Sequence, residues 1–150
     1  LGKIAARAIE THRSLLIQQG VRVETQGLDR PVYTDEKWAA FLLGQLLQNS
    51  ARYRREEPVI TLTARSLGKQ TQLIVRDNGM GIPAWELSRV FDRGFTGSNG
   101  RARGSSTGMG LYLCKKLAGF LELGLSIASE EGKGTTVTLT FPSREDLTEL

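Results

Sequence analysis

The stretch Asp77-Asn78-Gly79-Met80-Gly81-Ile82-Pro83 follows an alternating apolar run at 72–76, and the fold assignment depends most on it. The alternation predicts a strand, and the Asn-Gly and Gly-Ile-Pro steps are typical of a sharp turn. A carboxylate at the end of a strand can accept a hydrogen bond from an amino group in a pocket, and glycines let the backbone approach a flat ligand. The same residues also suit an ordinary strand-to-helix turn, so both interpretations stay open on this stretch alone.

Outward from this turn, the chain mixes helical and strand-like patterns. Helices are predicted over 3–19, from Thr34 or Asp35 to about 54, over 84–90 and over 107–121. Strands are predicted over 21–25, 59–64, 72–76, 125–129 and 135–141, with a hairpin turn at Gly68-Lys69 and a frayed tail at 142–150. This mixture predicts an α/β (α+β) two-layer sandwich, with the helices packed on one face of a mixed β-sheet.

Composition narrows the class of protein. The chain has 150 residues, of which 39% are hydrophobic and 24% charged, and this fits a single globular domain spanning 1–150. A single cysteine excludes a disulfide framework, and no uncharged apolar run reaches the roughly 18 residues of a membrane helix. The formal net charge of +4 favours an anionic partner. We find no aromatic-basic stacking surface or groove-reading helix, and therefore expect no nucleic acid partner.

Polar side chains interrupt the second predicted helix near its end. Gln45, Asn49 and Tyr53 are spaced i, i+4, i+8 and share one face, and Arg52 is adjacent. The carbonyl oxygen of Asn49 is a hard ligand that suits Mg²⁺, and a guanidinium group meets a phosphate through its planar fork. The alternative is a satisfied amide beside a solvated arginine, and this segment alone favours that alternative.

Glycine is concentrated in the second half of the chain. Thr107-Gly108-Met109-Gly110-Leu111 opens a predicted helix, where free backbone N–H groups and the helix dipole suit a phosphate. Residues 92–106 show no periodicity, and a loop of this length is typical of a lid, a binding loop or a disordered segment; the glycine-bearing segments on both sides favour a lid. Four arginines lie on or beside this loop: Arg89, Arg93, Arg101 and Arg103. They could bind a triphosphate, or they could be ordinary solvent-exposed side chains.

Together and in this order, these segments resemble the boxes of the GHKL, or Bergerat-fold, ATP-binding domain, in particular the catalytic domain of bacterial sensor histidine kinases. The matching segments are the N box at 45–53, the G1 box at 77–82, the F box at 90–95, the G2 box at 107–111 and the last glycine motif at 131–136. The resemblance extends from about residue 20 to 142 and implies a long ATP lid over 92–106. The stretch 91–101 is also similar to kinases of Gram-positive bacteria that sense antimicrobial peptides.

The resemblance implies a role for each matching position. Asp77 would bind the adenine amino group, supported by Thr136 from the neighbouring strand, and Asn49 would hold Mg²⁺ between the phosphates. The implied catalytic residues are Gln45, Asn49 and Arg52, with Arg52 on a phosphate where the family usually has lysine. Phe91 would contact the histidine-bearing dimerisation domain. The other positions implied to bind ATP are Tyr53, Gly79, Gly81, Ile82, Arg93, Phe95, Thr107, Gly108, Met109, Gly110 and Leu111.

Three departures from the family pattern matter. Gln45 stands where the family more usually has Asn and where hydrolysing relatives carry a Glu base, which argues against strong ATPase chemistry. Ser50 replaces Ala. The phosphoacceptor motif, His followed by Asp or Glu and then Arg, is missing, because His12 is followed by Arg13 and Ser14. We therefore expect the cytoplasmic catalytic domain of a longer, membrane-anchored receptor, monomeric in isolation and homodimeric in the intact receptor.

The implied function is transfer of the γ-phosphoryl group of Mg²⁺–ATP to a histidine on a separate dimerisation domain, from which a response regulator receives it. Catalysis would depend on positioning and charge neutralisation. Two alternatives are another GHKL member, such as an anti-sigma serine kinase or an ATPase, and a degenerate nucleotide-binding module without transfer activity.

Overall fold

The structure, a computed structural model, describes residues 1–92 and 110–143. It contains a five-stranded sheet in the order β1-β2-β3-β5-β4. The strands are β1 (Arg22–Gln26), β2 (Val59–Leu67), β3 (Gln70–Asp77), β4 (Gly124–Glu130) and β5 (Gly134–Phe141). The helices are α1 (Gly2–Thr11), α2 (Arg13–Gln18), α3 (Glu36–Arg52), α4 (Ala84–Leu87) and α6 (Gly110–Phe120).

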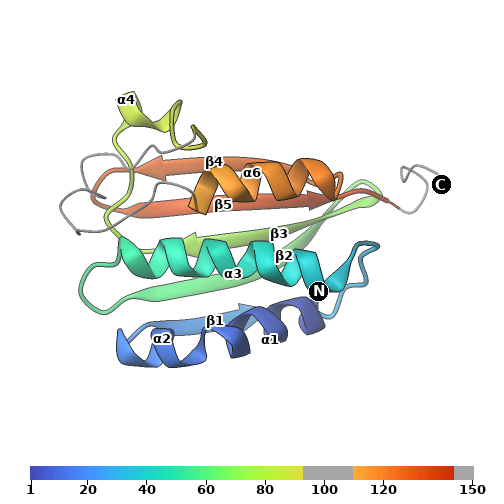
Figure 1. Ribbon diagram of the computed structural model, residues 1–150, viewed down its shortest axis with the longest axis horizontal. Helices are drawn as coiled ribbons and strands as arrows, with labels where there is room; N and C mark the ends of the chain where they lie inside the picture. The colour runs from blue at the N-terminus through green and yellow to red at the C-terminus, as the bar shows by residue number, and fades with distance from the viewer. Residues whose placement is uncertain (93–109, 144–150) are drawn as a thin grey trace.

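The sheet is mixed, and the helices form a second layer over it. β1 runs parallel to β2, and the other neighbouring strands are antiparallel. Figure 1 shows α1, α3 and α6 crossing the same face of the sheet, with α3 in the middle. The predicted two-layer sandwich is therefore confirmed. The predicted turn at Gly68-Lys69 is confirmed as well, because Leu67 and Gln70 pair directly across it.

The hydrophobic core lies between the helices and the inner face of the sheet. Side chains alternate between the two faces of a strand, and along β5 every second residue from Thr135 to Phe141 is accordingly buried. The helix α3 packs onto this face through four leucines with at most 2% exposure: Leu42, Leu43, Leu46 and Leu47. Close packing of this kind leaves little freedom for rigid elements to shift. The end of α3 is therefore held in a fixed position over the sheet.

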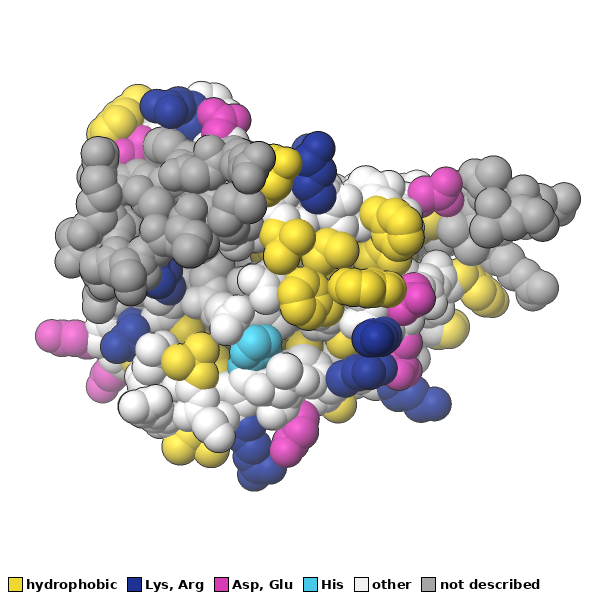
Figure 2. Space-filling view, viewed as in Figure 1, with side chains coloured by type: hydrophobic (Ala, Val, Ile, Leu, Met, Phe, Trp, Pro, Cys, Tyr) yellow, Lys and Arg dark blue, Asp and Glu magenta, His cyan; other side chains and the backbone are white. Residues whose placement is uncertain are grey.

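The outer side of the helix layer is less completely covered. Trp38, Phe41 and Phe120 remain exposed, and Trp38 meets the ring of Phe41 edge-on at a centroid distance of 5.9 Å. Figure 2 shows hydrophobic side chains gathered over α6 and the neighbouring part of α3. These aromatic residues lie on the first turns of α3 and the last turn of α6, away from the polar end of α3.

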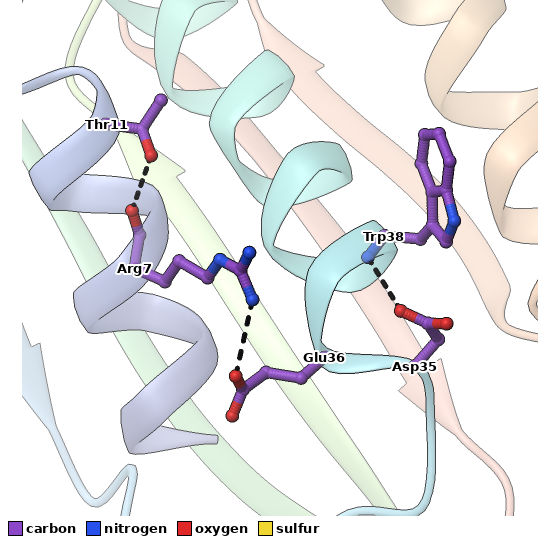
Figure 3. A network of polar contacts seen from close by, with 5 residues as sticks. All are labelled: Arg7, Thr11, Asp35, Glu36 and Trp38. Carbon is purple, nitrogen blue, oxygen red and sulfur yellow. Dashed lines mark hydrogen bonds and ion pairs between the residues drawn. The ribbon is translucent and has the colours of Figure 1, made fainter.

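The first turn of α3 is fixed by an acidic cap. The Asp35 carboxylate accepts a hydrogen bond from the backbone N–H of Trp38 at 3.0 Å, so Asp35 and not Thr34 is the cap. Figure 3 shows this cap beside the exposed ion pair of Arg7 and Glu36, which joins α1 to α3 at 3.4 Å. Because exposed ion pairs contribute little, the cap is the stronger of the two local interactions.

The prediction of one helix over 3–19 is wrong, because the helix breaks at His12. That residue has φ −108° and ψ 14°, and its backbone N–H is shared between the carbonyl oxygens of Ala8 and Ile9. Its ring packs directly on Gly44 of α3, where an added Cβ would lie 2.6 Å from the imidazole Nε2. The break therefore lets the histidine ring sit against α3 at a position without a side chain.

The other predicted helix and strand boundaries differ less from the structure. The helix predicted over 84–90 is a single turn, α4, and the strands around Gly68-Lys69 are longer than predicted. Within the described residues α6 begins at Gly110, so the predicted start at 107 falls outside them. The predicted lid over 92–106, apart from Asp92, and most of the predicted frayed tail at 142–150 also lie outside the described residues.

We predict that Asp35→Ala lowers the free energy of unfolding by about 1 kcal/mol, because the N–H of Trp38 loses its acceptor. Urea unfolding followed by circular dichroism measures the change. The matched control is Asp29→Ala, an exposed aspartate in the preceding loop, which should stay within about 0.5 kcal/mol of wild type. Equal losses in the two variants would show that the cap contributes nothing.

Candidate functional site

The last two turns of α3 carry four polar side chains that the sequence singles out. Gln45, Asn49, Arg52 and Tyr53 are all half-buried, and α3 ends at Arg52 with Tyr53 as its C-terminal cap. Residues four apart lie above one another on a helix. The structure therefore places the amides of Gln45 and Asn49 on one side of α3, as predicted, at the end of the helix nearest the loop after β3.

Asp77 ends β3, and its carboxylate is held by several donors. The Oδ1 atom accepts hydrogen bonds from the backbone N–H of Gly79 at 2.9 Å and of Thr135 at 3.2 Å. The Ser50 side chain on α3 is a third group that acts on this carboxylate. Burial raises the pKa of Asp77, and these three donors oppose the rise. The result is a desolvated, oriented acceptor at the edge of the sheet.

The loop after Asp77 touches the end of α3 directly. The backbone N–H of Met80 donates to the carbonyl oxygen of Tyr53 at 2.9 Å. Gly79 lies so close that an added Cβ would be 2.6 Å from the same oxygen. Only glycine permits this approach. The contact brings the helix that carries Asn49 next to the strand that ends at Asp77.

The other side of the loop rests on the turn between β4 and β5. The N–H of Gly132 donates to the carbonyl oxygen of Met80 at 2.7 Å, and the N–H of Ile82 donates to Ser129 Oγ at 2.8 Å. Gly81 has φ +72°, and a Cβ there would collide with the carbonyl of Glu130. The loop is therefore fixed between α3 on one side and the sheet on the other.

The structure corrects one assignment at the sheet. Asp77 pairs with Thr135, whose backbone N–H reaches its carboxylate, whereas Thr136 pairs with Arg76. Because strand neighbours point to opposite faces, buried Thr135 faces the helices, and Thr136 faces away from them. The expectation that Thr136 supports Asp77 is therefore wrong by one residue. Thr136 lines an open hollow of about 410 Å³ at the ends of β3, β4 and β5, which Asp77 and Thr135 also line.

Several predicted site residues lie outside the described part of the chain: Arg93, Phe95, Thr107, Gly108 and Met109. Gly110 and Leu111 are described and form the first turn of α6. Phe91 is half-buried, and the Lys115 ammonium group of α6 lies 5.6 Å from its ring centroid. The described residues thus place Asp77 and the loop after it next to the end of α3, and Phe91 next to Lys115 of α6.

Sequence reasoning missed three supporting hydroxyl groups. The sequence motifs give Ser50 no role beyond replacing Ala, although its side chain acts on the Asp77 carboxyl group. The hydroxyls of Ser129 and Thr135 lie 2.8 Å apart, and Ser129 also holds the N–H of Ile82. The sequence does contain a signal for Ser50, because a hydroxyl in a helix face that is otherwise apolar needs a partner.

A domain with this fold and these glycine-bearing loops matches one family over most of its length. Residues 34–145 match the family described as histidine kinase-, DNA gyrase B-, and HSP90-like ATPase. The chain therefore belongs to this family, and the resemblance stated from the sequence motifs is confirmed. Among the described residues, no helix has both the length and the apolar character needed to cross a membrane.

Individual relatives are bacterial sensor proteins. The chain is 42% identical over 138 residues to the sensor protein BceS of Bacillus subtilis (strain 168), and the match covers 92% of this chain and 41% of BceS. It is 37% identical over 122 residues to the sensor protein kinase GraS of Staphylococcus aureus (strain MRSA252), covering 81% of this chain and 35% of GraS. The chain therefore spans less than half the length of these relatives.

Solved structures show the same fold. A mycobacterial sensor histidine kinase, MprB, matches with a TM-score of 0.83 at 20% identity, covering 95% of each chain. The catalytic domain of histidine kinase ThkA matches with a TM-score of 0.77 at 20% identity, covering 95% of this chain and 92% of ThkA. The predicted Bergerat fold is confirmed by these matches.

We predict that Gly81→Ala lowers the free energy of unfolding by about 3 kcal/mol or more, because positive φ strain adds to a backbone collision. The matched control is Gly20→Ala, which has a similar φ of +66° and open space around an added Cβ, and which should lose only about 1 kcal/mol. Urea unfolding of both variants separates the two effects. Equal losses would mean that the loop relaxes away from Glu130.

The raised pKa of Asp77 predicts a pH-dependent stability cost. A carboxyl group whose pKa is higher in the folded than in the unfolded state binds more protons when folded, so folding stability falls as pH rises from the ordinary value of 3.8 through the raised value. We predict that Asp77→Asn, which removes this charge, gains stability relative to wild type over that range. Urea unfolding of both proteins between pH 3.5 and 7 measures it. A difference that does not change with pH contradicts the prediction.

Proposed function

We propose that this domain binds Mg²⁺–ATP and transfers its γ-phosphoryl group to a histidine on a separate dimerisation domain of a two-component sensor kinase. One observation carries the proposal. A half-buried, donor-held carboxylate at Asp77 lies beside the loop that rests directly on the end of α3, where the amide of Asn49 and the guanidinium of Arg52 are located. The site therefore has two ends. The end at Asp77 can bind the base of a nucleotide, and the end at Asn49 and Arg52 can bind its phosphates. Family membership supports it.

The adenine end is built by Asp77 and the loop that follows it. The carboxylate accepts a hydrogen bond from the 6-amino group of adenine, which is possible because its donors leave acceptor capacity free. Gly79, Gly81 and Ile82 form the wall, since their backbone is fixed by Tyr53 and Ser129. Thr135, and not Thr136, supports the carboxylate from the neighbouring strand.

The phosphate end is built by α3 and α6. The half-buried amide oxygen of Asn49 fits Mg²⁺, an ion that takes oxygen ligands and usually keeps phosphates and waters as the others. Bound there, the ion neutralises charge that develops on the phosphates. Arg52 contacts a phosphate oxygen through its guanidinium group, with Tyr53 flanking the nucleotide. Gly110 and Leu111 open α6, whose first turn offers backbone N–H groups to an anion.

The remaining implied ATP contacts stay predictions of the sequence motifs, as does the lid over 92–106. They are Arg93, Phe95, Thr107, Gly108 and Met109. All of them would act on the phosphate side, between the half-buried Phe91 and the first turn of α6.

In the transfer step, an imidazole nitrogen of the acceptor attacks the γ-phosphorus, the bond to the β–γ bridging oxygen breaks, and ADP leaves. The neutral amide of Gln45 cannot serve as a base, so the site orients the reactants and balances charge. Because position 45 carries no carboxylate, water has no activating carboxylate at this end of α3. This difference favours a kinase over a hydrolase within the family.

We further propose the partners that this role requires. Phe91, half-buried beside Lys115, contacts the histidine-bearing helices. A response regulator receives the phosphoryl group downstream, in a homodimeric receptor anchored to a membrane, with this domain in the cytoplasm. The similarity to BceS and GraS supports this assignment, and the signal we propose for the receptor is an antimicrobial peptide.

The proposed nucleotide contacts predict two losses of ATP affinity that can be measured separately. Asp77→Asn should weaken ATP binding by about tenfold or more, with or without Mg²⁺, because a hydrogen bond to a charged acceptor is lost. Asn49→Ala should weaken binding only when Mg²⁺ is present. Isothermal titration with ATP, in magnesium and in EDTA, measures both, and Asp29→Asn in the exposed loop is the control. Unchanged affinity in Asp77→Asn would remove the adenine assignment.

Phosphoryl transfer is tested with labelled ATP and a histidine-bearing dimerisation domain supplied in trans. We expect acid-labile, base-stable phosphate on that domain, and none when its histidine is replaced by glutamine. Acid-stable phosphoserine on another protein would favour the serine-kinase alternative. Nucleotide binding without any transfer would favour a degenerate module.

A further inference from the structure

The connection between α3 and β2, residues 53–58, is short and lies against the loop that follows β3. At its first residue, the carbonyl oxygen of Tyr53 accepts a hydrogen bond from the backbone N–H of Met80 at 2.9 Å. Near its other end, Glu57 has φ +51°, a left-handed conformation that residues other than glycine rarely adopt. Such a conformation costs free energy and persists only where the surrounding structure holds it. Specific contacts must therefore hold the connection at Glu57.

The side chain of Asn78 supplies those contacts. Its Nδ2 donates to the carbonyl oxygen of Glu57 at 3.1 Å, and its Oδ1 accepts a hydrogen bond from the backbone N–H of Val59 at 2.9 Å. The backbone N–H of Asn78 also donates to the carbonyl oxygen of Val59 at 3.3 Å. A carboxylate of the same size has no donor for Glu57. Because Asn78 directly follows Asp77, these bonds hold the end of the connection to the end of β3.

The start of the connection belongs to the other end of the proposed site. The large buried side chains that pack α3 on the sheet end at Leu47, and beyond it the buried positions of α3 are the small residues Ser50 and Ala51. Arg52 ends the helix and Tyr53 caps it, more than one turn of about 3.6 residues beyond Leu47. Because helix ends fray, the connection that follows contributes to holding Arg52 and Tyr53 in place.

We infer that Asn78 is a positioning residue, which fixes Arg52 and Tyr53 at the phosphate end relative to Asp77 at the base end. This inference rests on the proposed function. In this account Asn78 does not touch the nucleotide and acts through the connection 53–58. Two binding groups at the right separation hold the two halves of one ligand more tightly than either half alone, and small misplacements lose much of that gain. The effect of Asn78 should therefore appear only with ligands that occupy both ends.

The test compares a ligand that spans the site with ligands that occupy one end. Mg²⁺–ATP spans both ends, adenosine occupies the base end, and Mg²⁺–tripolyphosphate occupies the phosphate end. Competition against a fluorescent ATP analogue, whose own Kd is measured for each variant, gives the three affinities. Asn78→Ala should weaken ATP binding by about three- to tenfold, since two hydrogen bonds to the connection are lost. The affinities for adenosine and tripolyphosphate should each change by less than twofold.

Two further variants make the result specific. Gln70→Ala removes an amide at the opposite end of β3 and should leave all three affinities unchanged. Glu57→Gly removes the left-handed strain, because glycine adopts positive φ readily. The double variant Glu57→Gly/Asn78→Ala should therefore resist urea better than Asn78→Ala and still show the loss for ATP. It separates the effect of Asn78 on folding from its effect on position.

Each outcome decides the inference. A loss confined to ATP, in both the single and the double variant, supports it. Weakening of adenosine or tripolyphosphate as strongly as of ATP would show that Asn78 acts on one end or on the whole fold. Unchanged ATP affinity, or affinity restored by Glu57→Gly, would show that Asn78 positions nothing, and each of these results overturns the inference. Failure of the proposed function differs from all of them, because the wild-type protein itself would then bind no ATP.

Discussion

The close approach between the end of α3 and the loop after β3 is the contact on which the site depends. The N–H of Met80 reaches the carbonyl oxygen of Tyr53, and Gly79 has no room for a side chain. This contact fixes two elements that are far apart in the sequence. Four buried leucines hold α3 against the sheet, so the position of Asn49 relative to Asp77 follows from core packing, not from any interaction between the two side chains themselves.

The same contact accounts for the free-energy cost of ionising the Asp77 carboxyl group. A half-buried carboxylate is unfavourable when ionised, and burial is the largest influence on its pKa. The neighbouring donors from Gly79, Thr135 and Ser50 offset part of that cost and at the same time give the group a direction. A solvated aspartate would destabilise the fold less. Its hydrogen bond to a ligand would, however, only replace one to water, with little net gain in binding free energy. Orientation and desolvation are thus two consequences of one arrangement.

The sequence predicted the layers and the main elements because their signals are local. The cap at Asp35, the hairpin turn at Gly68-Lys69 and the alternation along β5 each depend on neighbouring residues. The errors depend on residues far away. At the helix break, the ring of His12 packs on Gly44, which lies 32 positions along the chain. A one-residue register difference moves the supporting role from Thr136 to Thr135 and reverses the face. The hydroxyl of Ser50 has a partner 27 positions along the chain, which periodicity does not reveal.

The geometry of the helix explains how Gln45 and Ser50, the two departures from the family pattern on α3, fit the proposed site. Successive residues of an α-helix are rotated by about 100°, so Asn49 and Ser50 face different directions from the same turn. One can serve the phosphates while the other reaches the strand that ends at Asp77. Gln45, one turn earlier on the side of Asn49, is neutral and can orient but not deprotonate. In the proposed function, the helix therefore sets the distance between the carboxylate that would bind the base and the amide that would serve the phosphates, and the nucleophile is the histidine of the acceptor domain.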